Sequence, residues 1–158
     1  MQPGGMAHKP LRLVCVNVNG LVSDAGKRSR FFAWLTEQHF DIVAISETHA
    51  SSDRQAGRWL QQGSASGRPW QGSAWWCHNR QARQQRQQQV RGVGLLVRDG
   101  VIPAGAEPAV EYSDSDGRLL RVGWDTPQGQ HWSVVVVYAP SVAAERPAFY
   151  SGPYMDAL

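Results

Sequence analysis

Cysteine and long apolar runs are scarce in this sequence of 158 residues. Its two cysteines, Cys15 and Cys77, are too few for a disulfide scaffold or a four-cysteine zinc site, and they favour a reducing, intracellular location. The longest apolar run, residues 132–139, is interrupted by Ser133 and falls far short of the roughly 20 residues that span a bilayer. Residues 1–10 hold no apolar stretch typical of a secretory signal. We therefore expect neither secretion nor a membrane partner.

Acidic residues are absent from residues 54–98, which hold eight arginines and no lysine. Residues 1–53 balance five basic against five acidic side chains, and residues 99–158 hold three basic and eight acidic ones. The formal net charge of +3 therefore conceals a basic middle segment. Such a segment is typical of a surface that binds a polyanion, DNA or RNA. It is equally typical of a solvated, glutamine-rich loop, and the sequence leaves both interpretations open.

The hydrophobic pattern predicts an α/β fold within a single domain-sized chain. Hydrophobic residues make up 42% of the chain, which is enough for a core. Branched apolar residues at 11–17 and 41–46 predict strands. Residues 27–39 between them predict a helix, with Ser23 or Asp24 as its cap. A strand, a helix and a strand in so short a span predict a βαβ unit with parallel strands.

The second half of the chain predicts antiparallel strands joined by short turns. The predicted strands are residues 92–98, a segment within 101–112, residues 118–125 and residues 132–138. Turn residues lie between them at 116–117 and 127–129, and residues 143–150 predict the start of a helix.

Residues 61–91 are rich in glutamine and arginine and are predicted to form a mobile insertion. Only residues 73–78 within it have the pattern of a strand. Residues 1–10 are predicted to be a flexible leader, and residues 151–158 a short tail.

Polar side chains follow both strands of the predicted βαβ unit. Asn17 and Asn19 lie at the end of the first strand, and Glu47 follows the second. Parallel neighbours end at the same edge of a sheet, where open α/β sheets bind ligands. A carboxylate leaving a buried strand needs a partner or a metal, and a carboxylate with an amide oxygen suits Mg²⁺. The plainer alternatives stay open here, since Asn19 with Gly20 is a common turn pair and Glu47 fits a solvent-facing strand end.

Five segments resemble, in order and spacing, the motifs of the endonuclease/exonuclease/phosphatase superfamily, which has the DNase I-like fold. They are residues 13–21 (LVCVNVNGL), 41–49 (DIVAISETH), 92–97 (GVGLLV), 116–118 (DGR) and 135–140 (VVVYAP). Ser46 stands where the second motif commonly has glutamine. The resemblance covers residues 11–150 as a partial domain. It implies the N-terminal half of a four-layer α/β sandwich, with one mixed sheet and covering helices.

Within this superfamily the chain most resembles the endonuclease domain of non-LTR (LINE-type) retrotransposons, a relative of apurinic/apyrimidinic endonucleases. The features that carry this are Glu-Thr-His at 47–49, a helix beginning at Lys27 and Arg28, Tyr-Ala-Pro at 138–140, then Arg146, Phe149 and Tyr150. The resemblance implies Mg²⁺-dependent nicking of DNA, with Mn²⁺ as the alternative cation. It also implies a downstream reverse transcriptase as partner and a nuclear location.

The resemblance also implies roles for individual residues. Glu47 matches the metal-binding glutamate, and Asn17 matches the active-site asparagine near metal and phosphate. Asn19 stands where apurinic endonucleases often have aspartate and retrotransposon enzymes often have asparagine. Tyr138 matches the tyrosine that contacts the scissile phosphate, and His49 fits the retrotransposon form of the second motif. The catalytic candidates are thus Asn17, Glu47 and Tyr138, the metal ligands Glu47 and Asn17, and the substrate-binding candidates Asn19 and His49.

Two of these positions have plainer interpretations. Tyr138 fits an aromatic residue at the end of a buried strand. Arg118, in the fourth motif, is predicted to be a surface arginine beside a turn.

The motifs that supply the general base in this family do not occur in the sequence. They are a Gly-Asp-x-Asn motif and a terminal Ser-Asp-His motif, whereas here the only aspartate after Tyr138 is Asp156 and no histidine follows His131. We therefore expect the chain to lack the C-terminal half of the domain and not to hydrolyse DNA appreciably by itself.

Truncation would also leave apolar surface uncovered. Alternate residues of 11–17 and 134–138 are expected to lack a partner sheet, which favours aggregation or pairing.

Two other functions stay open: another phosphoesterase of the superfamily, and a non-catalytic nucleic-acid-binding remnant. The second is favoured by the tryptophans near the arginine-rich segment, Trp59, Trp70, Trp75 and Trp76.

Overall fold

The computed structural model describes residues 10–62, 70–84 and 90–152. The predicted leader and tail therefore lie almost entirely outside the described residues. Residues 63–69 and 85–89 of the predicted insertion also lie outside them.

In the described residues the chain forms seven strands, four α-helices and one 3₁₀ turn. Their order is β1 (Leu13–Asn17), α1 (Ala25–Gln38), β2 (Ile42–Ser46), α2 (Asp53–Gln62), β3 (Gly72–Cys77), α3 (Arg80–Gln84), β4 (Val93–Arg98), β5 (Ala109–Ser113), β6 (Leu119–Asp125), β7 (His131–Val137), η1 (Ala143–Glu145) and α4 (Arg146–Ser151). No helix among these residues is long and apolar enough to cross a membrane.

The predicted βαβ unit is confirmed. β1 and β2 pair in parallel, with Asn17 opposite Ser46 at their ends. Asp24 caps α1, because its carboxylate accepts a hydrogen bond of 2.8 Å from the backbone N–H of Lys27. The helix ends at His39, which adopts the left-handed conformation typical of a helix terminus.

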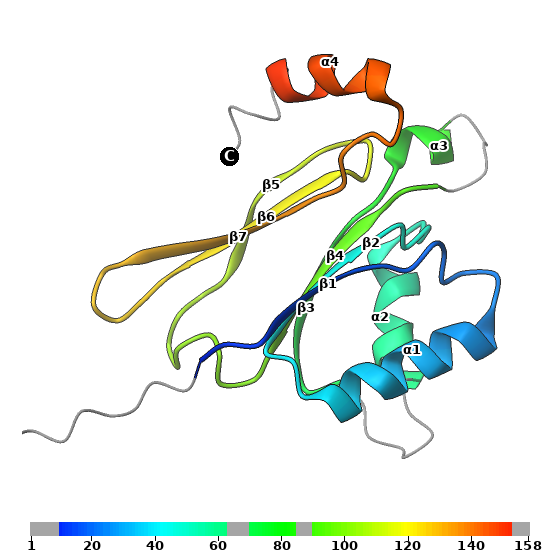
Figure 1. Ribbon diagram of the computed structural model, residues 1–158. Coiled ribbons are helices and arrows are strands. Elements are labelled where there is room, and N and C mark those ends of the chain that lie inside the picture. Colours follow the sequence, from blue (N-terminus) through cyan, green and yellow to red (C-terminus); the bar gives the residue numbers. More distant parts are fainter. Residues whose placement is uncertain (1–9, 63–69, 85–89, 153–158) are drawn as a thin grey trace, which may run out of the picture.

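The predicted α/β class and the mixed sheet with covering helices are confirmed, but the strands form two sheets, so the expectation of only one sheet is wrong. A four-stranded mixed sheet has the order β1-β2-β4-β3, and a separate three-stranded antiparallel sheet has the order β5-β6-β7. Figure 1 shows α1 and α2 against one face of the four-stranded sheet and the three-stranded sheet against its other face. The reason is that β5, β6 and β7 hydrogen-bond only with one another, and their apolar side chains pack against the face of the first sheet.

Alternation along the central strands builds a core on each face of the four-stranded sheet. In β2, Val43 and Ile45 pack toward the helices, whereas Ile42 and Ala44 pack toward the second sheet. The core between the sheets also contains Leu95, Leu120, Val122 and Val136. The described residues thus form three layers: helices, mixed sheet and antiparallel sheet.

The predicted uncovered apolar face is confirmed on β1 and wrong on β7. Val136 is buried between the sheets, and Val134 packs beside it. By contrast Leu11 and Leu13 are 54% and 56% exposed, and Cys15 is exposed as well. Because the second sheet has three strands to the first sheet's four, it does not reach over β1.

Two helices were not predicted. α2 has few apolar residues, but Ala56 and Trp59 recur at helical spacing and are buried against α1 and the sheet, with Leu60 partly buried beside them. α3 begins inside the glutamine- and arginine-rich stretch, and Asn79 caps it by accepting from the N–H of Ala82. Local composition hides both helices because arginine and glutamine surround their few apolar residues.

We expect a thiol reagent to modify Cys15 and to leave Cys77 of the folded chain unmodified. Cys15 is exposed, whereas Cys77 is buried and its Sγ donates to Oδ1 of Asp114 at 3.2 Å. Burial, reinforced by the negative charge of Asp114, raises the pKa of the Cys77 thiol to about 12, so that little thiolate forms near pH 8. Iodoacetamide labelling followed by peptide mass spectrometry measures both sites, with the denatured chain as control. Equal labelling rates in the native chain would contradict this burial.

Candidate functional site

Glu47 lies where β2 leaves the core. The strand before it is largely buried, and Glu47 itself is half-buried with a left-handed backbone (φ 57°). Its carbonyl accepts a hydrogen bond of 2.7 Å from the N–H of Gly20, in the loop that follows β1. The ends of the two parallel strands are thereby joined, and the carboxylate is placed at the expected edge of the sheet.

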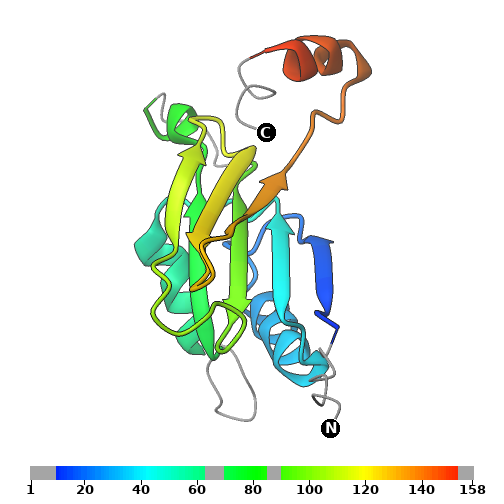
Figure 2. The ribbon, with the colours of Figure 1, turned by 90° about the vertical axis from the view of Figure 1, so that its left-hand side faces the viewer.

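Tyr138 reaches the same point from the second sheet. It directly follows β7, and its phenolic O–H donates a hydrogen bond to Oε1 of Glu47, 91 residues away in the sequence. Figure 2 shows β1, β2 and β7 ending toward the same side of the molecule, from which the chain continues to α4. The hydrogen bond to Glu47, together with burial, raises the pKa of Tyr138, so the phenol remains a proton donor at neutral pH.

Arg118 is buried, which contradicts the prediction of a surface arginine. Its side chain is 9% exposed, and Nη1 donates to the carbonyl of Tyr138 at 3.0 Å. The Tyr138 N–H donates in return to the carbonyl of Arg118 at 2.7 Å, and the guanidinium lies 5.3 Å from the centre of the tyrosine ring. Burial and the nearby charge of Arg91 lower the pKa of Arg118. Arg118 therefore holds Tyr138 in place from two sides.

Asn17 and Asn19 form the turn that the plainer interpretation predicts. Oδ1 of Asn17 accepts from the N–H of Asn19 at 2.9 Å, and Asn19 is left-handed (φ 43°). Nζ of Lys27 donates to the carbonyl of Asn19 at 2.8 Å, which places a cation beside the turn. An amide oxygen has a second lone pair, so this turn leaves Asn17 able to contact a ligand.

His49 packs against the turn after β1. A side chain on Gly20 would place its Cβ 2.8 Å from Nδ1 of His49, so only glycine fits there. Burial lowers the pKa of His49, although the charge of Glu47 partly opposes this. The imidazole is therefore neutral at pH 7.

Backbone and side-chain hydrogen bonds together close a ring of loops at this edge. Thr48 N–H donates to the carbonyl of Gly92 at 3.1 Å, and Gly92 N–H donates to the carbonyl of Gly117 at 2.9 Å. Gly117 directly precedes Arg118, whose guanidinium donates to the carbonyl of Tyr138. The phenol of Tyr138 donates in turn to Glu47, the residue before Thr48, and this bond closes the ring. We call the loops containing 47–49, 91–92, 116–118 and 138 the site ring.

Backbone strain gathers in and next to the site ring. Four non-glycine residues there have left-handed backbones: Asn19, Glu47, His49 and Arg91. Such conformations cost of order 1–3 kcal/mol each and persist only where the surrounding structure enforces them. They are found disproportionately at functional sites, which makes this edge the strongest candidate in the described residues.

The protein oxygens at this edge fit Mg²⁺ with few direct ligands. No group of three or more histidine, cysteine or carboxylate side chains in the described part of the chain could hold a metal ion. Mg²⁺ is commonly bound through one or two carboxylates, with waters and substrate phosphates completing its shell. A carboxylate has about four lone-pair positions, so Glu47 can accept from Tyr138 and still ligate a cation. The Asn17 amide oxygen, at the end of the neighbouring strand, is the second candidate donor.

Neither models of protein families nor curated protein sequences match this chain. The function must therefore be argued from the geometry of the site.

The structure brings together some of the predicted site residues and adds others. Glu47 and Tyr138 are in direct contact, Asn17 ends β1, and Asn19 and His49 lie in the loops that follow β1 and β2. Lys27 and Arg91 were not predicted to be site residues. For Lys27 the available indication was its place in the first turn of the predicted helix. For Arg91 it was the position just before the glycine of the third motif.

Proposed function

We propose that this chain supplies the metal- and phosphate-binding part of a DNase I-like phosphodiesterase site, of the kind used by retrotransposon endonucleases to nick DNA. The observation that carries the proposal is the hydrogen bond between Glu47 and Tyr138, which joins strand ends from two different sheets. Two sheets packed face to face, with helices outside the first, also support the DNase I-like sandwich.

Each residue then has a chemical role. Glu47 and Asn17 would hold Mg²⁺, which supplies charge stabilisation at a phosphoryl oxygen. The Tyr138 phenol has one O–H proton, which it donates to Glu47 in this structure; it would have to turn that proton to a phosphate oxygen once Mg²⁺ neutralises the carboxylate. Arg118 fixes the direction of that phenol through its contacts with the Tyr138 carbonyl and ring.

These residues bind and orient a phosphodiester but do not by themselves activate water. No aspartate and histidine pair follows Tyr138 in the sequence. The family motifs that supply a general base do not occur in this sequence, and we assign that role to none of the residues named above. Binding without rapid hydrolysis is therefore the proposed behaviour of this chain alone.

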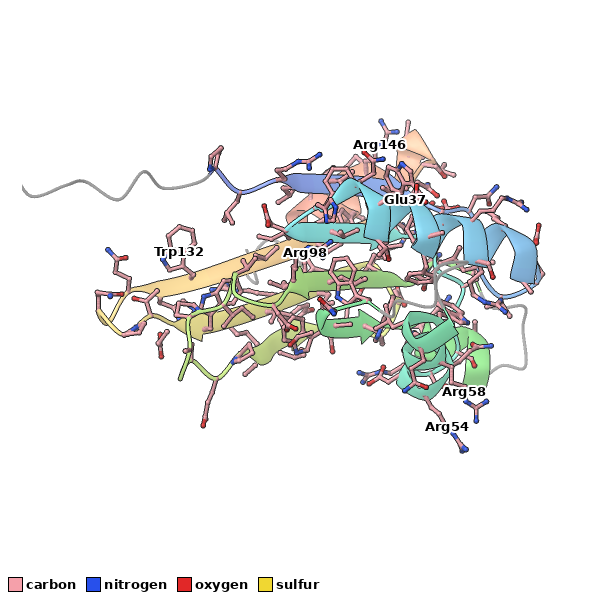
Figure 3. The ribbon with its side chains drawn as sticks, turned by 90° about the horizontal axis from the view of Figure 1, so that it is seen from below. Glu37, Arg54, Arg58, Arg98, Trp132 and Arg146 are labelled. Atoms are coloured by element: carbon pink, nitrogen blue, oxygen red, sulfur yellow. The ribbon has the colours of Figure 1, made fainter. Side chains whose placement is uncertain are left out.

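Replacing Glu47 with glutamine is expected to weaken Mn²⁺ binding at least tenfold, because the variant loses the carboxylate charge and keeps the size of the side chain. Electron paramagnetic resonance of free Mn²⁺, with Mg²⁺ as competitor, measures this. Glu37→Gln is the matched control, because Glu37 is exposed on α1 and is not in the site ring (Figure 3). Equal Mn²⁺ affinity in the two variants would argue against the site.

Plasmid nicking tests the second half of the proposal. The 158-residue chain in Mg²⁺ is expected to leave supercoiled plasmid intact. Robust nicking that Glu47→Ala abolishes would show that the chain contains its own general base. DNA binding that persists without any Mn²⁺ binding would favour the non-catalytic nucleic-acid-binding module instead.

A further inference from the structure

Two arginines lie at the site ring, and their surroundings differ. Arg118 is buried and committed to Tyr138, as described above. The side chain of Arg91 is 32% exposed, and its ion pair with Asp116 has a single N to O distance of 3.6 Å. A pair this long and this open lacks the two-pronged geometry of a strong arginine–carboxylate contact. The guanidinium of Arg91 is therefore available to an anion.

The backbone of Arg91 is held firmly although its side chain is open. Its carbonyl accepts from the N–H of His49 at 2.8 Å, and its backbone is left-handed (φ 67°). The next residue, Gly92, has no room for a side chain, because Thr48 Oγ1 occupies the place where a Cβ would lie. The surrounding loops therefore hold Arg91 in a backbone conformation that arginine does not favour. Strained residues of this kind are found at functional sites, where the side chain has a role.

The charge of Arg91 acts on the candidate catalytic tyrosine. It partly offsets the rise in the pKa of Tyr138 and adds to the lowering of the pKa of Arg118, in keeping with the backbone hydrogen bonds that join residues 91–92 to the loops of the site ring. Lys27, another cation near this edge, donates instead to the carbonyl of Asn19. Arg91 is thus the loosely paired cation beside Tyr138 in the described residues.

We propose that Arg91 binds a non-bridging phosphate oxygen of a polynucleotide whose phosphodiester lies at Tyr138, an inference that rests on the proposed function. The planar guanidinium presents two N–H groups at the spacing of two phosphate oxygens. An arriving phosphate replaces the weak contact with Asp116 and gains a charge-assisted pair. Arg118 builds the site in this account, and Arg91 binds the substrate.

The test compares DNA affinities of the full 158-residue chain by fluorescence anisotropy with a labelled duplex, in EDTA, over a series of salt concentrations. Arg91→Asn is the best variant, because asparagine removes the charge and tolerates the left-handed backbone. We expect about a tenfold loss of affinity and a salt slope smaller by about one, as for the loss of one phosphate contact. Arg91→Lys is expected to keep the slope and recover part of the affinity.

Arg58→Gln is the control, because Arg58 is exposed on α2, and Figure 3 shows its side chain pointing away from the sheets. It is expected to change affinity by less than twofold. Equal losses for Arg91→Asn and Arg58→Gln would overturn the inference in favour of diffuse attraction, and so would an absence of DNA binding by the native chain. Thermal melting of each variant shows that it is folded.

Failure of this inference is distinguishable from failure of the proposed function. The assay contains no metal, so it reports phosphate binding alone. Glu47→Gln tests the metal site through a separate measurement, the loss of Mn²⁺ binding. If Arg91→Asn binds DNA normally while Glu47→Gln loses Mn²⁺, only the role of Arg91 is wrong.

Discussion

Replacing Asp114 with alanine is expected to lower the free energy of unfolding by about 3 kcal/mol. Asp114 is 6% exposed, and its Oδ1 accepts from the backbone N–H groups of Arg118 and Leu119 and from Sγ of Cys77. Alanine would leave two buried N–H groups without partners, at about 1–3 kcal/mol each. The two costs sum to about 2–6 kcal/mol, and the loss falls in the lower half of that range because Oδ2 is buried without a hydrogen bond in the described residues, and alanine removes that cost.

Urea denaturation of Asp114→Ala measures the effect. Asp99→Ala is the matched control, because Asp99 is exposed after β4 and its replacement is expected to cost less than about 0.5 kcal/mol. Asp114→Asn should be intermediate, because it keeps an oxygen for one or both N–H groups. The idea fails if the alanine variants at 114 and 99 are equally stable. The position matters for the site, since Asp114 holds the backbone from which Arg118 reaches Tyr138.

Replacing Gly117 with alanine is expected to cost about 3 kcal/mol, from two sources. The first is backbone strain, since Gly117 is left-handed (φ 71°). The second is a collision, because a Cβ would lie 2.7 Å from the backbone nitrogen of Asn79 and 2.9 Å from that of Gly92. Backbone atoms held by hydrogen bonds and a β-bridge, as these are, cannot move aside as a flexible side chain can. The variant is also expected to weaken DNA binding, because a shift of Gly92 would displace Arg91, the residue directly before it.

Gly105→Ala separates the two sources. Gly105 is also left-handed (φ 85°), but nothing lies within 4 Å of its would-be Cβ. Its replacement should therefore cost about 1 kcal/mol from strain alone. Thermal and urea unfolding measure the loss of stability in each variant. The difference between the two losses gives the cost of the collision at Gly117. Equal costs would mean that the loops of the site ring are less closely packed than described.

Local patterns predicted most elements of this chain because the pattern of one segment depends little on the rest. The two parallel strands and α1 follow from runs of apolar residues and a capping aspartate, and they appear within two residues of the predicted bounds. α2 was missed because its apolar residues, Ala56, Trp59 and Leu60, stand among arginine and glutamine. A helix of that composition is stabilised by its burial, which a local pattern does not show.

The position of the candidate site was also predictable from sequence. Asn17 and Glu47 follow neighbouring parallel strands, and the geometry of a βαβ unit places both at one edge. The contact of Tyr138 with Glu47 was not derivable in the same way. It depends on how the second sheet lies on the first, and the expectation of one sheet gave no means to place it.

The sequence by itself determined the parallel pair, the strand ends that carry Asn17 and Glu47, and the acid-free arginine-rich middle. The tertiary structure decided which arginine is buried and which is open. Arg118 was predicted to be exposed because it follows a turn. In the structure its side chain is buried and donates to the carbonyl of Tyr138, at the end of a strand of the second sheet. Burial of a turn residue depends on long-range packing, because the atoms that cover it come from strands distant in the sequence. The same packing leaves Arg91 at the rim with its charge weakly paired.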